Sequence, residues 1–163
     1  MAETEKLEQA KAVYTELCNF FDGRKWKCRK DDGQMKLGGD VDGDTETYSF
    51  YFQVSPESAL VRLILFMPFD VPQEKSTEYA VVITALNSLL AAGCFALDAQ
   101  RELAFFRISN SFCDSRIDTE VYLQMLMSAL GTVDTLAVKL AAFVAGKLGM
   151  EELLTALSAL EEG

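Results

Sequence analysis

The stretch LVRLILFM, residues 60–67, is apolar at every position except Arg62. Successive side chains of a β-strand point to opposite faces of the sheet, so a continuous apolar run of this length indicates a strand that is covered on both sides. A turn is predicted before this run at residues 56–58, and Pro68 and Pro72 predict its end. We therefore expect residues 60–67 to form a central strand of a sheet.

Strand-like and helix-like segments alternate around this run. Short strands are predicted at residues 25–29, 35–37, 48–54, 94–97 and 103–108. Apolar residues spaced by three and four predict helices over residues 4–21, 79–90, 118–145 and 150–160. Groups of strands set between helices are typical of an α+β fold. We predict one domain over residues 1–163, with an antiparallel sheet and helices packed on one of its faces.

The chain carries a strong negative charge. Its 163 residues have a formal net charge of -10 at pH 7, and half of them are apolar. The field of such a molecule repels polyanions, so we expect neither nucleic acid nor a membrane surface as a partner. Lys139 interrupts the best candidate for a membrane-spanning segment, and residues 1–11 do not resemble a secretory signal. We expect a cytoplasmic protein.

The sequence contains no histidine, the side chain that most often acts as a general base near neutral pH. It also lacks the G-x-S-x-G and S-x-x-K patterns of serine nucleophiles, and Gly146-Lys147 does not belong to a phosphate-binding loop. Enzymes that use only carboxylates exist, so these absences argue against catalysis without excluding it. We predict no enzyme and no catalytic residue.

The aspartates at positions 40, 42 and 44 are spaced like the start of a calcium loop. Such a loop needs a glycine at its sixth position and a glutamate at its twelfth, where this chain has Thr45 and Tyr51. A solvated hairpin loop is the better interpretation. The cysteines, which are not close enough in sequence to form a zinc set, are predicted to be free thiols, and we expect no metal and no cofactor. They are Cys18, Cys28, Cys94 and Cys113.

Basic residues crowd the segment 24–30 of this acidic chain. They could dock an acidic peptide or a phosphate. Alternatively, outward-pointing lysines could guard an edge strand against pairing with other chains, which is the interpretation we favour. The residues are Arg24, Lys25, Lys27, Arg29 and Lys30.

Arg62 is an anomaly, because an isolated charge buried between apolar faces costs several kcal/mol. It could pair with a carboxylate while its aliphatic stem packs against neighbours, which we favour. Alternatively, it could share a sheet face with Tyr51 and Arg107 and form a polar, partly wet surface suited to a ligand or to the main chain of a partner. Tyr51, Arg62 and Arg107 are therefore candidate binding residues.

Met125 and Met127 lie off the main apolar stripe of the helix predicted at residues 118–145. For either methionine alone, packing in the core is the interpretation we favour. Taken together with the leucines of the last helix, they indicate more apolar surface than one sheet face can cover. Methionine-rich surfaces adapt to varied partners. We therefore expect a second apolar contact that includes Met125 and Met127, most simply in a symmetric homodimer.

One pattern in the middle of the chain combines Asn87 with the segments GCFALD at 93–98 and LAFFRIS at 103–109. This pattern resembles the YbjN-domain family. Members of that family are similar in fold to the type III secretion chaperones and are often described as sensory transduction regulators. The resemblance implies the order α-β-β-β-α-β-β-α, followed here by a short C-terminal helix.

The resemblance also implies a homodimer that binds polypeptide segments and has no cofactor. It places Asn87 as the polar residue near the end of the second helix, Arg107 as the charge in the fifth strand, and Asp134 as the acidic position in the third long helix. Two departures from the family are the long loop at residues 38–44 and the additional helix at residues 150–160, which could cover the usual dimer surface.

These observations predict a non-enzymatic protein-binding module, chaperone-like or regulatory, whose partners are a second copy of itself and an unidentified protein or peptide. The alternative is a small-ligand sensor or a carboxylate-dependent enzyme with a site around Arg62 and Arg107. A fold alone does not decide between these functions.

Overall fold

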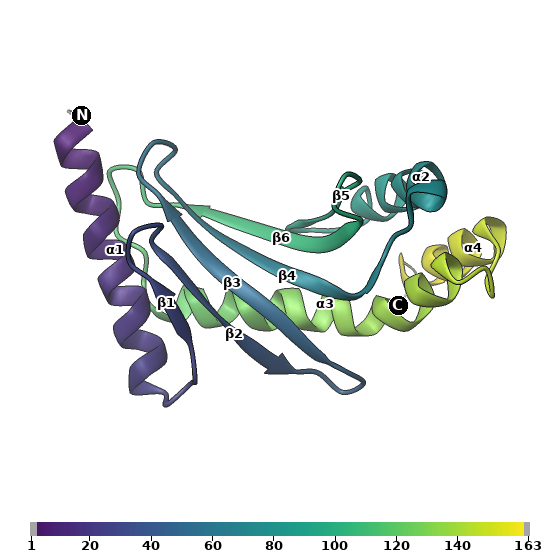
Figure 1. The fold of residues 1–163 in the computed structure, drawn as a ribbon, viewed down its shortest axis with the longest axis horizontal. Coiled ribbons are helices and arrows are strands. Elements are labelled where there is room, and N and C mark those ends of the chain that lie inside the picture. Colours follow the sequence, from purple (N-terminus) through teal and green to yellow (C-terminus); the bar gives the residue numbers. More distant parts are fainter. Residues whose placement is uncertain (1–2, 162–163) are drawn as a thin grey trace.

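The structure, a computed structural model, describes residues 3–161. Its six-stranded antiparallel sheet has the order β1-β2-β3-β4-β6-β5 (Figure 1). Strand β4 (Leu60–Asp70) lies between β3 (Thr47–Ser55) and β6 (Leu103–Ser111), as the apolar run at 60–67 predicts for an interior strand. The remaining strands are β1 (Arg29–Asp31), β2 (Lys36–Asp42) and β5 (Cys94–Asp98).

The described residues also form four α-helices, and α3 runs along one face of the sheet (Figure 1). Phe21 of α1 and Tyr122 of α3 both lie against Phe52 of β3, with ring centroids 5.6 and 6.2 Å from it. The helices therefore pack on one face of the sheet, which we call the inner face, and the predicted α+β fold is confirmed. The helices are α1 (Glu3–Gly23), α2 (Ser76–Asn87), α3 (Glu120–Val144) and α4 (Met150–Glu161), with a 3-10 turn, η1 (Gln73–Lys75), before α2.

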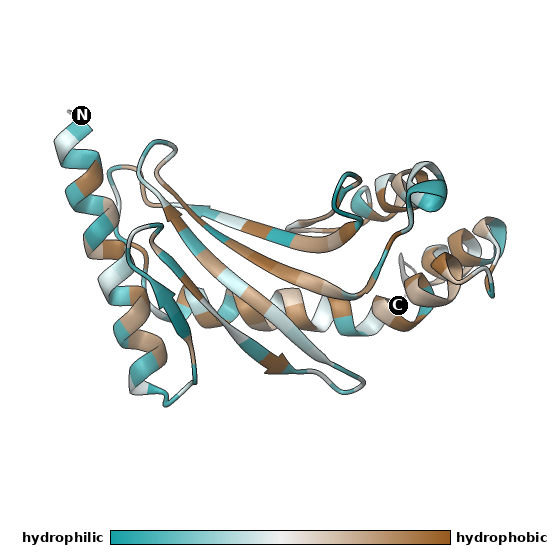
Figure 2. Cartoon of the chain, viewed as in Figure 1, coloured by the Kyte–Doolittle hydropathy of each residue, from teal (hydrophilic) through white to brown (hydrophobic). Residues whose placement is uncertain are grey.

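The core forms because every second side chain of the central strands points to the inner face. Leu63 of β4 is fully buried, and the register places it between Phe52 of β3 and Ile108 of β6. Strand β4 is hydrophobic over most of its length (Figure 2). Removing one large apolar side chain from water contributes about 1.5–3 kcal/mol, so this layer supplies much of the driving force for folding.

The strand predicted at residues 25–29 is mostly wrong, because β1 begins only at Arg29. Lys25 has a φ of 59°, which lies outside the extended region and interrupts any strand there. Trp26 instead packs against Phe21 and Phe50, with ring centroids 5.4 and 6.1 Å apart. The alternation of this segment therefore belongs to a loop that anchors Trp26 to the core.

Strand β2 continues through Gly38 and Gly39, where we predicted that it would end. A Cβ on Gly39 would lie 3.3 Å from both the Lys27 carbonyl oxygen and the Phe50 ring, so glycine allows the preceding loop to cross closely over the strand. Much of the predicted loop at residues 38–44 is thus strand. Four strands precede α2, one more than in the order that the resemblance implies.

Strand β4 also continues through Pro68, which we expected to end it. The pairing with β6 shifts register between Phe66 and Asp70. Such an irregularity accommodates a residue that has no N–H to donate to the ladder.

Helix α3 is long and apolar enough to cross a membrane by length and composition alone, although we expected Lys139 to exclude this. Its residues Tyr122, Leu126 and Val133 are fully buried against the rest of the chain. The core helix of a folded domain passes the same test, and the described contacts of α3 are those of a core helix.

Candidate functional site

The side of the sheet opposite the inner face carries Tyr51, Arg62 and Arg107. We call this side the open face; it consists of the outward-pointing side chains of β2 to β6. The register places Ile64 between Tyr51 and Arg107, and Arg62 lies two residues before Ile64 on the same face. Arg62 and Arg107 are thus diagonal neighbours on adjacent strands, a relation that separates residues by about 7 Å. The structure therefore brings three of the five predicted site residues together.

Arg62 is half-buried, and its Nε is shielded from solvent without a hydrogen-bond acceptor among residues 3–161. No carboxylate among the described residues lies within ion-pair distance of it, so the salt bridge that we favoured from the sequence is wrong. A desolvated donor without a partner costs about 1–3 kcal/mol. The Nη groups of Arg62 are not shielded in this way, so an anionic acceptor supplied by another molecule can bind them and compensate the charge.

Aromatic side chains form a row next to the arginines. The ring centroids of Tyr51 and Phe66 are 5.9 Å apart, and those of Phe66 and Phe105 are 6.5 Å apart. Ile64 is only 5% exposed, although the helices pack on the other face, because its neighbours on the open face shield it. The open face therefore offers apolar contact area directly beside positive charge.

Lys36 and Arg107 extend the positive charge of the open face. The Lys36 Nζ lies 5.0 Å from the ring centroid of Tyr51, a cation–π contact. The Arg107 Nη2 contacts the Cys94 Sγ at 3.8 Å, and sulfur is a weak acceptor. Within the described part of the chain, neither cation forms an ion pair. Lys36 and Arg107 are thus unpaired among the described residues, although the protein has 25 acidic and only 15 basic residues and carboxylates are in excess.

The aspartates of β2 lie at the far end of the open face and already accept hydrogen bonds. Asp40 accepts from the Ser49 hydroxyl at 2.7 Å, and Asp42 accepts from the Thr47 hydroxyl at 2.6 Å. They belong to a strand and not to the hairpin loop that we predicted. No three Cys, Asp or Glu side chains are grouped as metal ligands within residues 3–161.

The two predicted methionines occupy different environments. Met125 is 5% exposed and belongs to the core, so its assignment to an exposed surface is wrong; the helical turn directs it inward beside Tyr122. Met127 is 41% exposed. With Leu130 and Trp26 it lines a hollow of about 560 Å³ between α3 and β2.

Helix α3 presents an outer row of exposed residues without charge, which we call the α3 stripe. Its Val138 is 60% exposed, and the Thr135 hydroxyl donates to the Gly131 carbonyl oxygen at 2.7 Å, so this polar group is satisfied within the helix. A Cβ on Gly131 would meet no atom within 4 Å. Close packing by another helix would use such a surface well. The stripe consists of Gln124, Met127, Ser128, Gly131, Thr135 and Val138.

Asp134 binds the turn between β2 and β3 to α3. Its carboxylate accepts from the Tyr48 hydroxyl and the Thr45 hydroxyl, each at 2.7 Å, and from the backbone N–H groups of Thr45 at 3.3 Å and Asp44 at 2.7 Å. These hydrogen bonds, that of Tyr48 first, lower the pKa of Asp134 to about 2. A Cβ on Gly43 would clash with this carboxylate. The role of Asp134 is thus to hold a turn.

The sequence pattern did not predict this arrangement of Asp134. One signal was present: the helix has no other charged residue between Val121 and Val138. A single carboxylate in such a long uncharged segment indicates a specific local partner.

Asn87 completes the hydrogen bonding of the edge strand β5. The Phe95 N–H donates to the Asn87 Oδ1 at 2.7 Å, and the Asn87 Nδ2 donates to the Phe95 carbonyl oxygen at 2.9 Å. The amide side chain thus takes the place of a neighbouring strand at this residue. The role of Asn87 is structural.

The four cysteines are free thiols, as predicted. Cys18 is buried, Cys28 and Cys94 are half-buried, and Cys113 is exposed. Burial raises the pKa of the Cys18 and Cys28 thiols, which favours their protonated form.

The basic segment 24–30 is partly neutralised. Arg24 lies 2.7 Å from the Glu120 carboxylate, and Lys30 lies 2.6 Å from the Asp22 carboxylate. Strand β1, at the end of this segment, is an edge of the sheet with all its residues exposed. This placement agrees with the guarding of an edge strand that we favoured.

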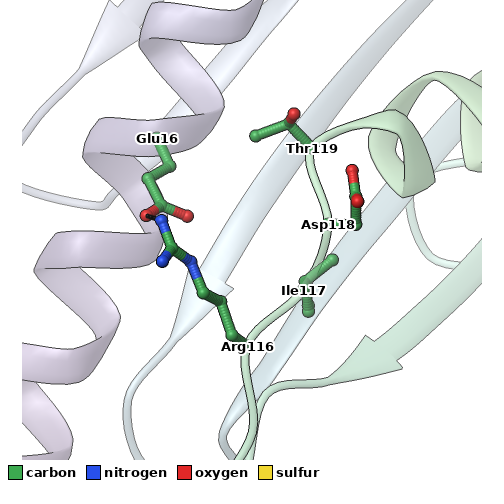
Figure 3. Close-up of a pocket in the computed structure, with 5 residues that line it drawn as sticks. All are labelled: Glu16, Arg116, Ile117, Asp118 and Thr119. Carbon is green, nitrogen blue, oxygen red and sulfur yellow. Dashed lines mark hydrogen bonds and ion pairs between the residues drawn. The ribbon is translucent and has the colours of Figure 1, made fainter.

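A hollow of about 360 Å³ separates α1 from the loop that leads into α3 (Figure 3). Arg116 reaches across it, with its Nη2 2.9 Å from the Glu16 Oε1. This ion pair neutralises Arg116 and connects the loop to α1. The hollow therefore fits an anionic ligand less well than the open face does.

No family model, no curated protein and no solved structure matches this chain. The resemblance to the YbjN-domain family therefore stays a prediction. The class that the structure defines is an α+β domain in which helices pack on one face of an antiparallel sheet. The opposite face carries cations, unpaired within residues 3–161, beside aromatic rings.

Proposed function

We propose that this protein is a non-enzymatic protein-binding module, chaperone-like or regulatory, which acts as a homodimer and binds polypeptide segments on the open face. The observation that carries the proposal is the row of Tyr51, Phe66 and Phe105 beside the unpartnered Arg62. Aromatic rings supply contact area, and a guanidinium supplies donors for the oxygens of a partner. We place the protein in the cytoplasm, where thiols stay reduced.

The chemistry of the open face favours binding over catalysis. Arginine side chains are always protonated, so neither Arg62 nor Arg107 can accept a proton. The aspartates Asp40, Asp42 and Asp98 of that face are engaged with hydroxyl groups or with Arg101. The chain has no histidine that could act as a general base.

The α3 stripe is our candidate surface for the homodimer. Two copies of a chain with a net charge of -10 repel each other, and contact through an uncharged surface adds least to this repulsion. Gly131 costs about 1 kcal/mol relative to alanine in an exposed helix, and a close helix crossing would offset that cost. Met127 and Val138 would supply apolar contact on either side of it.

Binding is tested by selecting random peptides on the immobilised protein by phage display and titrating them calorimetrically. We expect the double variant Phe66→Ser, Phe105→Ser to lose at least about tenfold in affinity, because two aromatic contacts are removed. The matched control is Val81→Ser on α2, where Val81 is 51% exposed. If no selected peptide depends on Phe66 and Phe105, binding at the open face is contradicted.

Self-association is tested by sedimentation at micromolar concentration. We expect a dimer for the parent protein and a monomer for Val138→Lys, because the variant buries a charge in the interface. Val81→Lys is the control with a comparably exposed valine. A parent protein that sediments as a monomer contradicts the homodimer.

A small-ligand sensor or carboxylate-dependent enzyme is the second candidate, because Arg62 and Arg107 do lie on one face. Small-molecule sites usually enclose most of the ligand surface in a concave pocket. Neither arginine lines any of five hollows of about 360 to 560 Å³ on the described surface. An extended partner suits these arginines better than an enclosed ligand.

A further inference from the structure

We infer that the open face takes an acidic polypeptide segment in extended conformation, in which a carboxylate that binds Arg62 is followed by large apolar side chains at every second residue. This inference rests on the proposed function and specifies the chemistry of its partner.

The charge of the face favours an anion. Gln53 of β3 pairs with Lys36 of β2 on one side and with Arg62 of β4 on the other. Two strand spacings therefore separate Lys36 from Arg62, which is about 10 Å. Arg107 is the diagonal neighbour of Arg62. No described carboxylate pairs with these three cations. Their mutual repulsion is unfavourable, and a bound carboxylate would relieve it.

The geometry of Arg62 favours a carboxylate over a neutral acceptor. Its Nε is shielded from solvent, whereas its two Nη groups form no described hydrogen bond and are not shielded, so a carboxylate can bind them end-on through two parallel hydrogen bonds. A main-chain carbonyl would satisfy one donor but would leave the charge uncompensated. A carboxylate satisfies two donors and neutralises the charge.

The repeat of β4 specifies where the apolar side chains of the partner lie. Arg62, Ile64 and Phe66 follow one another on the open face at steps of two residues. Each step spans about 6.6 Å, and an extended partner segment has the same repeat. If a partner segment lies along β4 with its carboxylate at Arg62, its next side chains that face the sheet lie over Ile64 and over the rings of Phe66 and Phe105.

The probes that test this inference are two peptides with blocked ends, Gly-Glu-Ser-Leu-Ser-Phe-Ser-Gly and the same peptide with Gln in place of Glu. Each is titrated into ¹⁵N-labelled protein, and the amide shifts are followed. We expect the Glu peptide to shift amides of β4 and β6 and to bind about tenfold more tightly than the Gln peptide.

Variants then assign the preference to one side chain. Arg62→Gln is expected to abolish the preference for the Glu peptide, and Arg62→Lys to restore part of it, because lysine keeps the charge and loses the fork. Arg101→Gln is the matched control, since Arg101 has a side chain 78% exposed in the turn between β5 and β6. The amide spectrum of each variant reports whether it is folded.

The outcomes separate this inference from the proposed function. Equal affinities for the two peptides, with both dependent on Phe66 and Phe105, overturn the acidic partner and leave the binding module standing. If Arg62→Gln abolishes self-association in sedimentation, the occupant is a second copy of the chain, which also overturns the inference. If neither peptide shifts the open face and no selected peptide depends on it, the inference and binding at the open face fail together.

Discussion

On its inner face β4 carries Val61, Leu63 and Leu65, and each of these side chains is fully buried. On its open face, by contrast, Arg62 and Phe66 are only partly buried. The sequence of β4 is almost equally apolar on both faces, yet only one face is covered by helices. A strand that is apolar on both faces can thus have one face in the core and the other available to a partner. In β4 the available face is the one that carries the charge of Arg62.

The largest effect should come from removing a core side chain of β4 and comparing it with its neighbour on the open face. We expect Leu63→Ala to lower the free energy of unfolding by about 3 kcal/mol and Ile64→Ala by about half of that, because Ile64 loses fewer contacts. Urea unfolding measures both. Equal losses would contradict the difference between the two faces.

The next effect concerns the edge of the sheet, where Asn87 substitutes for a strand. Asn87→Ala should cost about 2 kcal/mol, since it leaves the N–H and carbonyl groups of Phe95 unpaired. The control is Asn19→Ala, which removes an exposed asparagine from α1. A similar change in melting temperature for the two variants would show that Asn87 is not needed at this edge.

A smaller, pH-dependent effect is expected at Asp134, which connects the β2–β3 turn to the inner layer. Because its pKa is lowered from 3.8 to about 2, its contribution to stability is complete above about pH 4 and is lost as the pH falls towards 2. We expect Asp134→Asn to cost about 1 kcal/mol at pH 7, since solvent weakens these hydrogen bonds, and to flatten the stability curve between pH 4 and 2.

The control for Asp134 is Glu74→Gln, which makes the same change in net charge at an exposed site. Thermal unfolding followed over this pH range compares the two variants. An unchanged acid transition in Asp134→Asn would contradict the assigned role of the carboxylate.

The smallest effect should appear at two tyrosines within the inner layer. The hydroxyls of Tyr79 and Tyr122 are buried and have no hydrogen-bond partner in the part of the chain that the structure describes, and burial raises the pKa of both side chains. Tyr79→Phe should therefore be neutral or stabilise the protein by up to about 1 kcal/mol. Tyr14 is the contrasting case, because its hydroxyl can donate a hydrogen bond to the Asp32 carboxylate or to the Lys36 carbonyl oxygen, each 3.0 Å away. Tyr14→Phe should therefore destabilise the protein.

Much of the fold could be predicted from local periodicity. The helical spacing of apolar residues predicted all four helices, and the strands around residues 48–54, 60–67, 94–97 and 103–108 are observed. The errors lie where tertiary contacts override the local pattern. Trp26 alternates with lysines, as in a strand, but its ring is held in the core by Phe21 and Phe50.

The candidate site was predictable only in part. The isolated charge of Arg62 marked β4 as unusual, and strand alternation allowed Tyr51 and Arg107 to join it. The salt bridge that we favoured for Arg62 and the exposure of Met125 were both wrong. Each depends on which groups from distant segments come close, and one sequence gives no measure of that.

The sequence by itself determined the four helices, most of the strands, the excess of negative charge and the lack of histidine, because these follow from residue types and from spacings of a few residues. Only the tertiary structure decided which face of β4 the helices cover, that Arg62 lies diagonal to Arg107 with no carboxylate of the described residues paired to it, and that Asp134 binds a turn 89 residues away at Thr45. The physical reason is that strand order, register and helix packing depend on contacts between residues far apart in the chain.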